Sequence, residues 1–306
     1  MSDIINGVWE ICNQFIVDGR GDSVCLCEAG MVTVAEDIKE KLSDLKDNWW
    51  GYPKCIDKTS DKNYKMLCYE LLADSINYQY WYGKHDIRPN GACANRMYEL
   101  LNEAICQVES QPFVSSTDGA IRDTSKIFIK LISMERFPNI ENRIRHINEV
   151  TNSLRRCDFK KMSKRISEGK MSINEFLEFV ITNLPGYAED IFLKRAFLLP
   201  IMLYRRVQWF KDEVDILPVP ADYQIPKMLE GLGCINYSYL LSEKIQNGEL
   251  IPSGSVEECE IRAATMLAGK RLSEISGHTM CDIDIYLWLK RKEIDKPFHL
   301  TITTNY

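Results

Sequence analysis

The hydrophobic positions of this 306-residue chain recur mostly every three or four residues, which is the spacing of amphipathic helices. Between residues 140 and 154 this spacing is kept by Ile144, Ile147, Val150 and Leu154. After residue 172 it is kept again, up to Pro185, where the missing amide hydrogen favours the end of a helix. The pattern therefore predicts a mainly helical protein.

Three capping-box sequences predict where helices begin. Thr33 to Glu36, Ser172 to Glu175 and Ser255 to Glu258 each place a hydroxyl residue three positions before a glutamate. The third box opens an apolar pattern that runs to about Ile275. We expect a helix after each box.

Strand signals are few, which keeps the predicted fold mainly α with few short strands. Phe298, Leu300 and Ile302 alternate with polar residues and predict a C-terminal strand. Residues 19–34 are compatible with a short hairpin. Residues 188–210 read as one long helix that Pro200 kinks or breaks.

A polar, irregular stretch divides the chain near its N-terminus. Residues 44–60 carry few periodic positions and contain Trp49, Trp50, Gly51 and Pro53. We expect residues 1–60 to form a small segment packed on the main body. Residues 61–306 are then expected to form the helical domain as one compact unit.

Composition excludes several classes of partner. The net charge is −6 and the pI is about 5.5, so a nucleic-acid polymer is not an expected partner, because such binding needs a basic face. Eleven cysteines and four histidines occur without metal-binding spacing, which predicts reduced thiols and no metal. No apolar run approaches 18 residues, so we expect no membrane association and a soluble, cytoplasmic protein.

Asp222 is the first candidate for chemistry. It lies in the stretch Ala221-Asp222-Tyr223, four residues before Pro226. An aspartate before a helix is a favoured N-cap, and a proline is tolerated in the first turn. A cap at the mouth of a site can also meet a ligand, so the two roles are compatible.

Cations and acids recur around it, each with a structural alternative. Lys194 and Arg195 lie in an apolar run, where they either extend to the surface or contact a phosphate. Glu260 and Arg262 either form a solvated helix face or contact a ligand. Glu258 is most simply the acceptor of its capping box.

Aromatic side chains accompany two further acids. Asp284 precedes Tyr286 and Trp288 and is either a cap or a site residue. Asp74 leads the segment from Ser75 to Tyr82, which holds Asn77 and Trp81. Aromatic clusters are more often core, but a planar ligand needs such a stacking wall.

Taken together and in order, these segments resemble the queuosine salvage family, the queuosine 5′-phosphate N-glycosylases. The resemblance runs from about residue 30 to the C-terminus. It is carried by Asp74-Ser75-Ile76-Asn77-Tyr78 with Trp81; Pro138 with Glu141, Arg143, Arg145, Asn148 and Glu149; Phe192 with Lys194-Arg195-Ala196; Ala221-Asp222-Tyr223 with Pro226; Glu258 and Glu260-Ile261-Arg262; Asp284 with Tyr286-Leu287-Trp288; and Pro297-Phe298-His299.

The resemblance implies a helical fold related to the helix-hairpin-helix DNA glycosylases, and hydrolysis of queuosine 5′-monophosphate to queuine and ribose 5-phosphate without cofactor or metal. We take a monomer as the working expectation. We assign Asp222 and Asp284 to catalysis, one beside C1′ and the other on the base. The expected substrate-binding residues are Asp74, Asn77, Trp81, Lys194, Arg195, Tyr223, Glu260, Arg262, Tyr286, Trp288 and His299.

Two alternatives stay open at this point. One is a nucleic-acid base glycosylase on a related scaffold, which requires a basic groove. The other is a non-catalytic protein that binds queuine or queuosine and releases no base.

Overall fold

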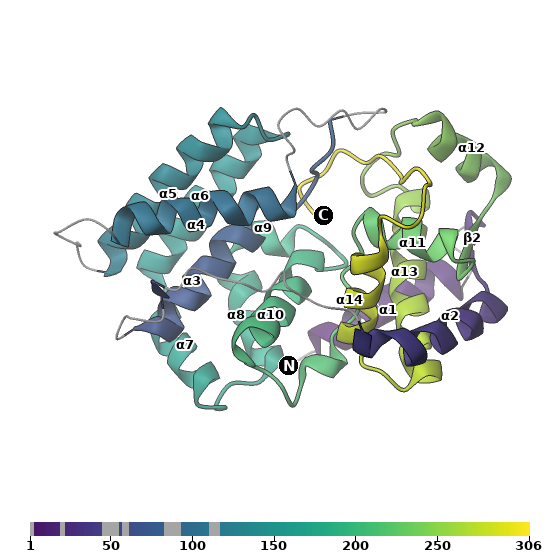
Figure 1. The fold of residues 1–306 in the computed structure, drawn as a ribbon, viewed down its shortest axis with the longest axis horizontal. Helices are drawn as coiled ribbons and strands as arrows, with labels where there is room; N and C mark the ends of the chain where they lie inside the picture. The colour runs from purple at the N-terminus through teal and green to yellow at the C-terminus, as the bar shows by residue number, and fades with distance from the viewer. Residues whose placement is uncertain (1–2, 19–21, 45–54, 57–60, 83–92, 110–116) are drawn as a thin grey trace. The chain divides into compact units, whose positions relative to one another are not determined.

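The computed structural model describes residues 3–18, 22–44, 55–56, 61–82, 93–109 and 117–306. Helices dominate these residues, which confirms the mainly α prediction (Figure 1). The predicted loop with Trp49, Trp50, Gly51 and Pro53 lies outside the described residues. No helix among the described residues is both long and apolar enough to cross a membrane.

The chain divides into two compact units. The first comprises Met1–Asp47, Asp190–Phe197 and Asp212–Tyr306, and the second comprises Asn48–Glu189 and Leu198–Lys211. Each unit is therefore built from segments that are distant in the sequence. The division predicted from the sequence, with a small segment over residues 1–60 and one helical domain over residues 61–306, stays a prediction.

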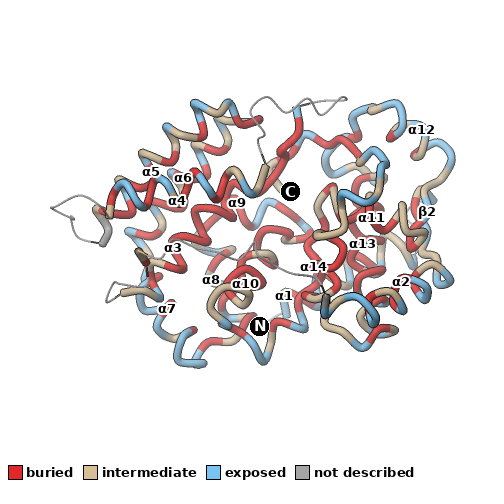
Figure 2. Tube along the Cα trace, in the orientation of Figure 1, coloured by how far each residue is buried: buried red, intermediate tan, exposed pale blue. Residues whose placement is uncertain are grey.

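The first unit is assembled around one long helix, α13 (Val256–Ser276). α13 packs against α1, α2, α11 and α14, and Figure 2 shows most of its length as buried. Burial on several sides explains why its sequence has no single apolar stripe. The other elements of this unit are α1 (Ile4–Ile16), β1 (Val24–Leu26), α2 (Glu28–Lys41), η1 (Leu42–Asp44), η4 (Val214–Ile216), α11 (Gln224–Gly231), β2 (Ile235–Tyr237), α12 (Tyr239–Asn247) and α14 (Met280–Lys290).

The predicted hairpin within residues 19–34 is wrong. β1 pairs antiparallel with β2, with Val24 opposite Tyr237 and Leu26 opposite Ile235. The chain then turns into α2, where Gly30 packs on the backbone: a Cβ at this position would lie 1.9 Å from the carbonyl oxygen of Gly233. Glycine is required here because the two backbones approach so closely.

The second unit is a helical assembly. Its helices are α3 (Lys62–Asp74), α4 (Ala94–Glu109), α5 (Thr117–Met134), α6 (Ile140–Arg156), α7 (Phe159–Ser167), α8 (Ile173–Asn183) and α9 (Pro185–Ala188). α4 packs on α5, α5 on α6, and α3 on α6 and α7. The helix predicted between residues 140 and 154 is thus confirmed as α6.

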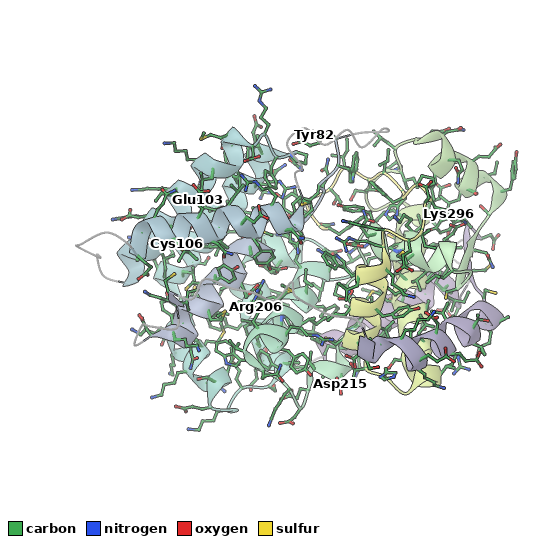
Figure 3. The ribbon with its side chains drawn as sticks, viewed as in Figure 1. Tyr82, Glu103, Cys106, Arg206, Asp215 and Lys296 are labelled. Atoms are coloured by element: carbon green, nitrogen blue, oxygen red, sulfur yellow. The ribbon has the colours of Figure 1, made fainter. Side chains whose placement is uncertain are left out.

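A buried ion pair lies inside the second unit. Arg206, labelled in Figure 3, contacts the carboxylate of Glu70 on α3, and both side chains are fully buried. The hydroxyl of Tyr98 donates to Glu70 at 3.0 Å, and the Arg206 guanidinium lies 4.7 Å from the Tyr98 ring. Such a pair is tolerated in a core because each partner compensates the other's charge.

Two of the three predicted capping boxes mark helix starts. The Ser172–Glu175 box is complete at the start of α8, and Ser255 caps α13 through the amide of Glu258. The prediction for Thr33 is wrong, because α2 begins at Glu28 and the Thr33 hydroxyl donates back to the carbonyl of Ala29. Thr33 therefore lies inside α2, where its hydroxyl makes a local hydrogen bond to the preceding turn and does not cap a helix start.

Two further predictions are wrong. The expected single helix over 188–210 is interrupted at 190–193, where Leu193 has a φ of +51°, and α10 (Lys194–Val207) then continues through Pro200. The expected C-terminal strand is a single bridge, in which Leu300 pairs with Leu250. Alternating residues make a strand only where a partner strand supplies a ladder.

Candidate active site

The Asp222 carboxylate lies at the start of α11. Its Oδ1 accepts hydrogen bonds from the amides of Gln224 at 2.7 Å and Ile225 at 2.9 Å. This confirms the predicted capping role, which Asp222 fulfils from the position just before Tyr223, the residue that directly precedes α11. The other oxygen, Oδ2, accepts no hydrogen bond within the part of the chain that the structure describes. Asp222 is half-buried, and one of its carboxylate oxygens is fixed by capping while the other is not used for it.

A tight turn precedes Lys194. The Asp190 carboxylate accepts the amide hydrogens of Phe192 at 3.1 Å and Lys194 at 2.8 Å, and so fixes the first residue of α10. The alternative in which Lys194 and Arg195 extend to the surface is wrong, since they are only 4% and 2% exposed. Asp190 is missing from the sequence-based candidates, although an aspartate before an apolar helix is a recognisable capping signal.

Arg262 joins the two segments. Its two terminal nitrogens each donate to one oxygen of Asp190 at 2.7 Å, and its Nε donates to the carbonyl oxygen of Ala221 at 3.2 Å. The guanidinium lies over the rings of Phe192 at 4.7 Å and Tyr306 at 4.4 Å. Each guanidinium nitrogen thus donates within the protein, and the alternative of a solvated helix face is wrong at 1% exposure.

Charge holds Asp190 ionised in this buried place. Burial alone would raise the pKa of the Asp190 carboxyl, but the charge and hydrogen bonds of Arg262 outweigh it and hold that pKa below its usual range. The pair is therefore a carboxylate and a guanidinium at neutral pH.

Glu258 and the C-terminal residues complete this network. Glu258 accepts from the Gly254 amide at 3.0 Å and from Arg262 at 3.4 Å. His299 Nε2 lies 3.0 Å from the Tyr306 hydroxyl. Burial, and then the nearby Arg262 charge, lower the pKa of His299 to about 3, so the imidazole is neutral.

Glu260 is also buried, which makes the solvated alternative wrong for it too. Its carboxylate accepts the amide hydrogen of Ser23 at 3.2 Å, just before β1. Burial raises the pKa of Glu260, while the Ser23 hydrogen bonds oppose that rise. Glu260 therefore holds the N-terminal chain against α13.

α14 carries Asp284 in its second turn, where the side chain is half-buried. The cap alternative for Asp284 is wrong, because Thr279 caps this helix in a box with Asp282. Asp284 therefore does not cap α14.

The aromatic candidates of the first unit have separate surroundings. Tyr286 is a core residue whose hydroxyl hydrogen-bonds Asp37 on α2. The guanidinium of Arg291 covers the Trp288 ring at 3.5 Å. The Tyr223 ring packs on Phe298 at 4.7 Å, beside Asp222 in the sequence. Among these aromatic candidates, Tyr223 is the one that directly follows the carboxylate that caps α11.

The remaining candidates share one segment of the second unit. Asp74 ends α3 and is fully buried, and Asn77 and Trp81 follow it at 9% and 3% exposure. Residues 75–81 are non-helical and buried throughout. Such a segment needs partners for its backbone carbonyls.

Arg143 on α6 supplies those partners. It donates to the carbonyl oxygens of Tyr78 at 2.5 Å, Gln79 at 2.6 Å and Pro138 at 2.7 Å, and also to that of Ile76. Its guanidinium lies 4.6 Å from the Tyr78 ring. One buried arginine thus fixes the segment that carries Asn77.

Among the described residues, no group of three or more His, Cys, Asp and Glu side chains is arranged to hold a metal ion. The site residues therefore offer carboxylates, buried cations and aromatic rings. They define a helical protein whose candidate carboxylate is held at a helix start beside a buried cation. The queuosine salvage protein family model matches residues 57–306, and the chain belongs to that family.

Curated relatives cover most of the chain. A protein of Dictyostelium discoideum is 25% identical over 295 residues, 88% of each chain. One of Nematostella vectensis is 25% identical over 345 residues, 96% of each chain. One of Sphaerobacter thermophilus is 25% identical over 81% of this chain and 83% of its own. Each of the three is named a queuosine 5′-phosphate N-glycosylase/hydrolase.

Proposed function

We propose that this protein is a hydrolase that cleaves the N-glycosidic bond of queuosine 5′-monophosphate and releases queuine and ribose 5-phosphate. Membership of the family and the names of its relatives support the activity. The main structural support for the site is the carboxylate of Asp222, which caps α11. Its Oδ1 is held by two amides, and its Oδ2 accepts no hydrogen bond from the described residues.

The chemistry explains why a fixed carboxylate is needed. In a 7-deazaguanine, carbon replaces N7, so the base cannot be made a better leaving group by protonation there. The bond between C1′ and the base nitrogen breaks with its electron pair going to the base, and positive charge builds on the ribose. A carboxylate beside C1′ stabilises that charge, as in other glycosidases.

We assign Asp222 to C1′, because its orientation is fixed before substrate binds. Asp222 Oδ2 then either attacks C1′, forming an ester that water hydrolyses in a second step, or takes the proton from a water that attacks C1′. In both routes one water supplies the hydroxyl that ends on C1′ and the proton that the departing base nitrogen takes up. Asp284, in mid-helix rather than at a cap, is assigned to the base or its aminomethyl group. Fixing one oxygen in advance lowers the reorganisation required in the transition state.

Lys194, with Arg195, is assigned to the 5′-phosphate. A buried ammonium is a strong partner for a phosphate dianion, and a contact remote from the reacting bond can position the ribose. Tyr223 and Trp288 are assigned to the planar base, together with His299 as a polar contact of the substrate. The substrate contacts expected of Asp74, Asn77 and Trp81, which belong to the second unit, stay a prediction. Glu260, Arg262 and Tyr286 are better explained by the internal contacts described above.

Three broader expectations belong to the same proposal. We propose that the fold is related to the helix-hairpin-helix DNA glycosylases, that the protein acts as a cytoplasmic monomer, and that it takes a free nucleotide rather than a polymer. The net charge of −6 supports the last point. The eleven cysteines, which form no disulfide among the described residues, support the cytoplasmic location.

The test is to incubate purified protein with queuosine 5′-monophosphate and to measure free queuine by mass spectrometry, with Asp222→Asn alongside. We expect release by the wild-type protein and none by the variant. Ligand binding without release would instead indicate a binding protein. Release only from transfer RNA would indicate a polymer-directed glycosylase.

A further inference from the structure

We propose that Asp190 and Arg262 are positioning residues that hold Asp222 and Lys194 in a fixed relation to each other without touching the substrate. The inference rests on the proposed function, because it gives these two residues a role at that site. They connect the start of α10 to the residue before Asp222.

The hydrogen bonds form a continuous chain. Asp190 Oδ2 accepts from the Lys194 amide at 2.8 Å and from Arg262 at 2.7 Å. Arg262 Nε then donates to the carbonyl oxygen of Ala221 at 3.2 Å. Ala221 is bonded directly to Asp222. A single side-chain pair thus anchors both backbone segments that carry the assigned catalytic and phosphate-binding residues.

The geometry makes this anchor specific to arginine. The planar guanidinium makes two parallel bonds to Asp190 and presents a third donor, Nε, in another direction. A lysine ammonium in the same place can pair with Asp190 but has no Nε to reach Ala221. Asp190 and Arg262 are 2% and 1% exposed, so water cannot substitute readily for a lost bond.

A purely stabilising pair would behave differently from a positioning pair. Loss of stability reduces the fraction of active protein, and so lowers activity on all substrates by the same factor. Loss of position at Lys194 weakens only substrates with a 5′-phosphate. The ratio of kcat/KM for queuosine 5′-monophosphate to kcat/KM for queuosine therefore separates the two roles.

The first experiment measures this ratio in Asp190→Asn, and in Asp190→Glu, which keeps the charge but moves the carboxylate by one methylene. We expect the ratio to fall about tenfold or more in both. Added to Lys194→Ala, either change should leave the ratio where Lys194→Ala alone puts it. The matched control is Asp158→Asn at the exposed cap of α7, which should keep the wild-type ratio. An unchanged ratio in the Asp190 variants would overturn the proposal.

The second experiment uses Arg262→Lys. We expect kcat to fall about 10- to 100-fold on both substrates, while calorimetry still finds one ribose 5-phosphate bound per chain. Arg271→Lys is the matched control, since Arg271 lies on the same helix and pairs with Glu28 at the surface. A binding stoichiometry that falls in step with kcat would mean that Arg262 only stabilises the fold.

Ribose 5-phosphate binding also separates this inference from the proposed function. If wild-type protein binds it but releases no queuine, the proposed function fails. The positioning role then stands if Asp190→Asn weakens binding as much as Lys194→Ala does. It falls if Asp190→Asn binds like wild type, and it falls with the function if wild type binds no ribose 5-phosphate.

Discussion

Arg262 donates from Nε to the carbonyl oxygen of Ala221 at 3.2 Å, one residue before Asp222, whose carboxylate caps α11. The loop that carries Asp222 is therefore held at two points. The backbone is tied to a buried guanidinium, and the side chain is tied to the first amides of α11. A carboxylate held in this way has little freedom to reorient, which suits a residue placed beside a reacting carbon.

Asp222→Asn should separate the capping role from the catalytic one. Asparagine caps a helix as well as aspartate does, so we expect a change in unfolding free energy below about 1 kcal/mol. We also expect queuine release to be lost, because an amide oxygen can neither attack C1′ nor accept a proton from water. Urea unfolding and mass spectrometry measure the two effects, and near-normal kcat in the variant would restrict Asp222 to capping.

Lys194→Ala should weaken nucleotide substrates selectively. We expect kcat/KM for queuosine 5′-monophosphate to fall about 10- to 100-fold more than kcat/KM for queuosine, because only the nucleotide carries the charge that the ammonium meets. Lys270→Ala on α13 is the control, since that lysine lies over the Trp9 ring. Equal losses on both substrates would remove the phosphate role of Lys194.

His299 should make the fold sensitive to acid. Its pKa is about 3 in the folded protein and about 6.5 when exposed, so the unfolded chain binds more protons between these values. Stability is therefore complete above about pH 6.5 and is lost as the pH falls toward 3. We expect a loss of about 2–3 kcal/mol between pH 7 and pH 4.5 from this residue.

The comparison is His299→Gln, which keeps a hydrogen-bonding group for the Tyr306 hydroxyl but does not titrate. Its unfolding free energy should fall less than that of the wild type over the same range, as measured by urea unfolding at each pH. Parallel curves for the two proteins would show that His299 does not set the acid response.

Arg143→Ala should destabilise the second unit strongly. The change removes the Arg143 donors from the buried carbonyls of Tyr78 and Gln79, while that of Ile76 keeps the Tyr78 amide as a donor. We expect a loss of at least about 3 kcal/mol. Arg145→Ala is the control, because the Arg145 side chain is half-exposed. Its ion pair with Glu189, at 3.8 Å, is a surface pair that contributes little to stability. A similar unfolding midpoint for both variants would contradict this role.

Interactions within a few residues of one another were open to prediction from the sequence. The Ser172 box and the Asp222 cap depend on amides two or three positions away, and both are present. The helix from Ile140 to Arg156 follows from apolar spacing in the same way. Such features are determined locally, because a side chain and the amides of the next turn are always neighbours.

Tertiary structure decided what the local pattern leaves open. Val24 pairs with Tyr237, and Asp190 with Arg262, across long stretches of sequence. Glu260 and Arg262 look like a solvated helix face, yet α13 is enclosed by α1, α2, α11 and α14. By itself, the sequence determined the helices α6 and α8, the start of α13, the Asp222 cap and, through its ordered motifs, the family. Only packing decided which charged residues are buried and paired, because burial depends on neighbours that come from distant parts of the chain.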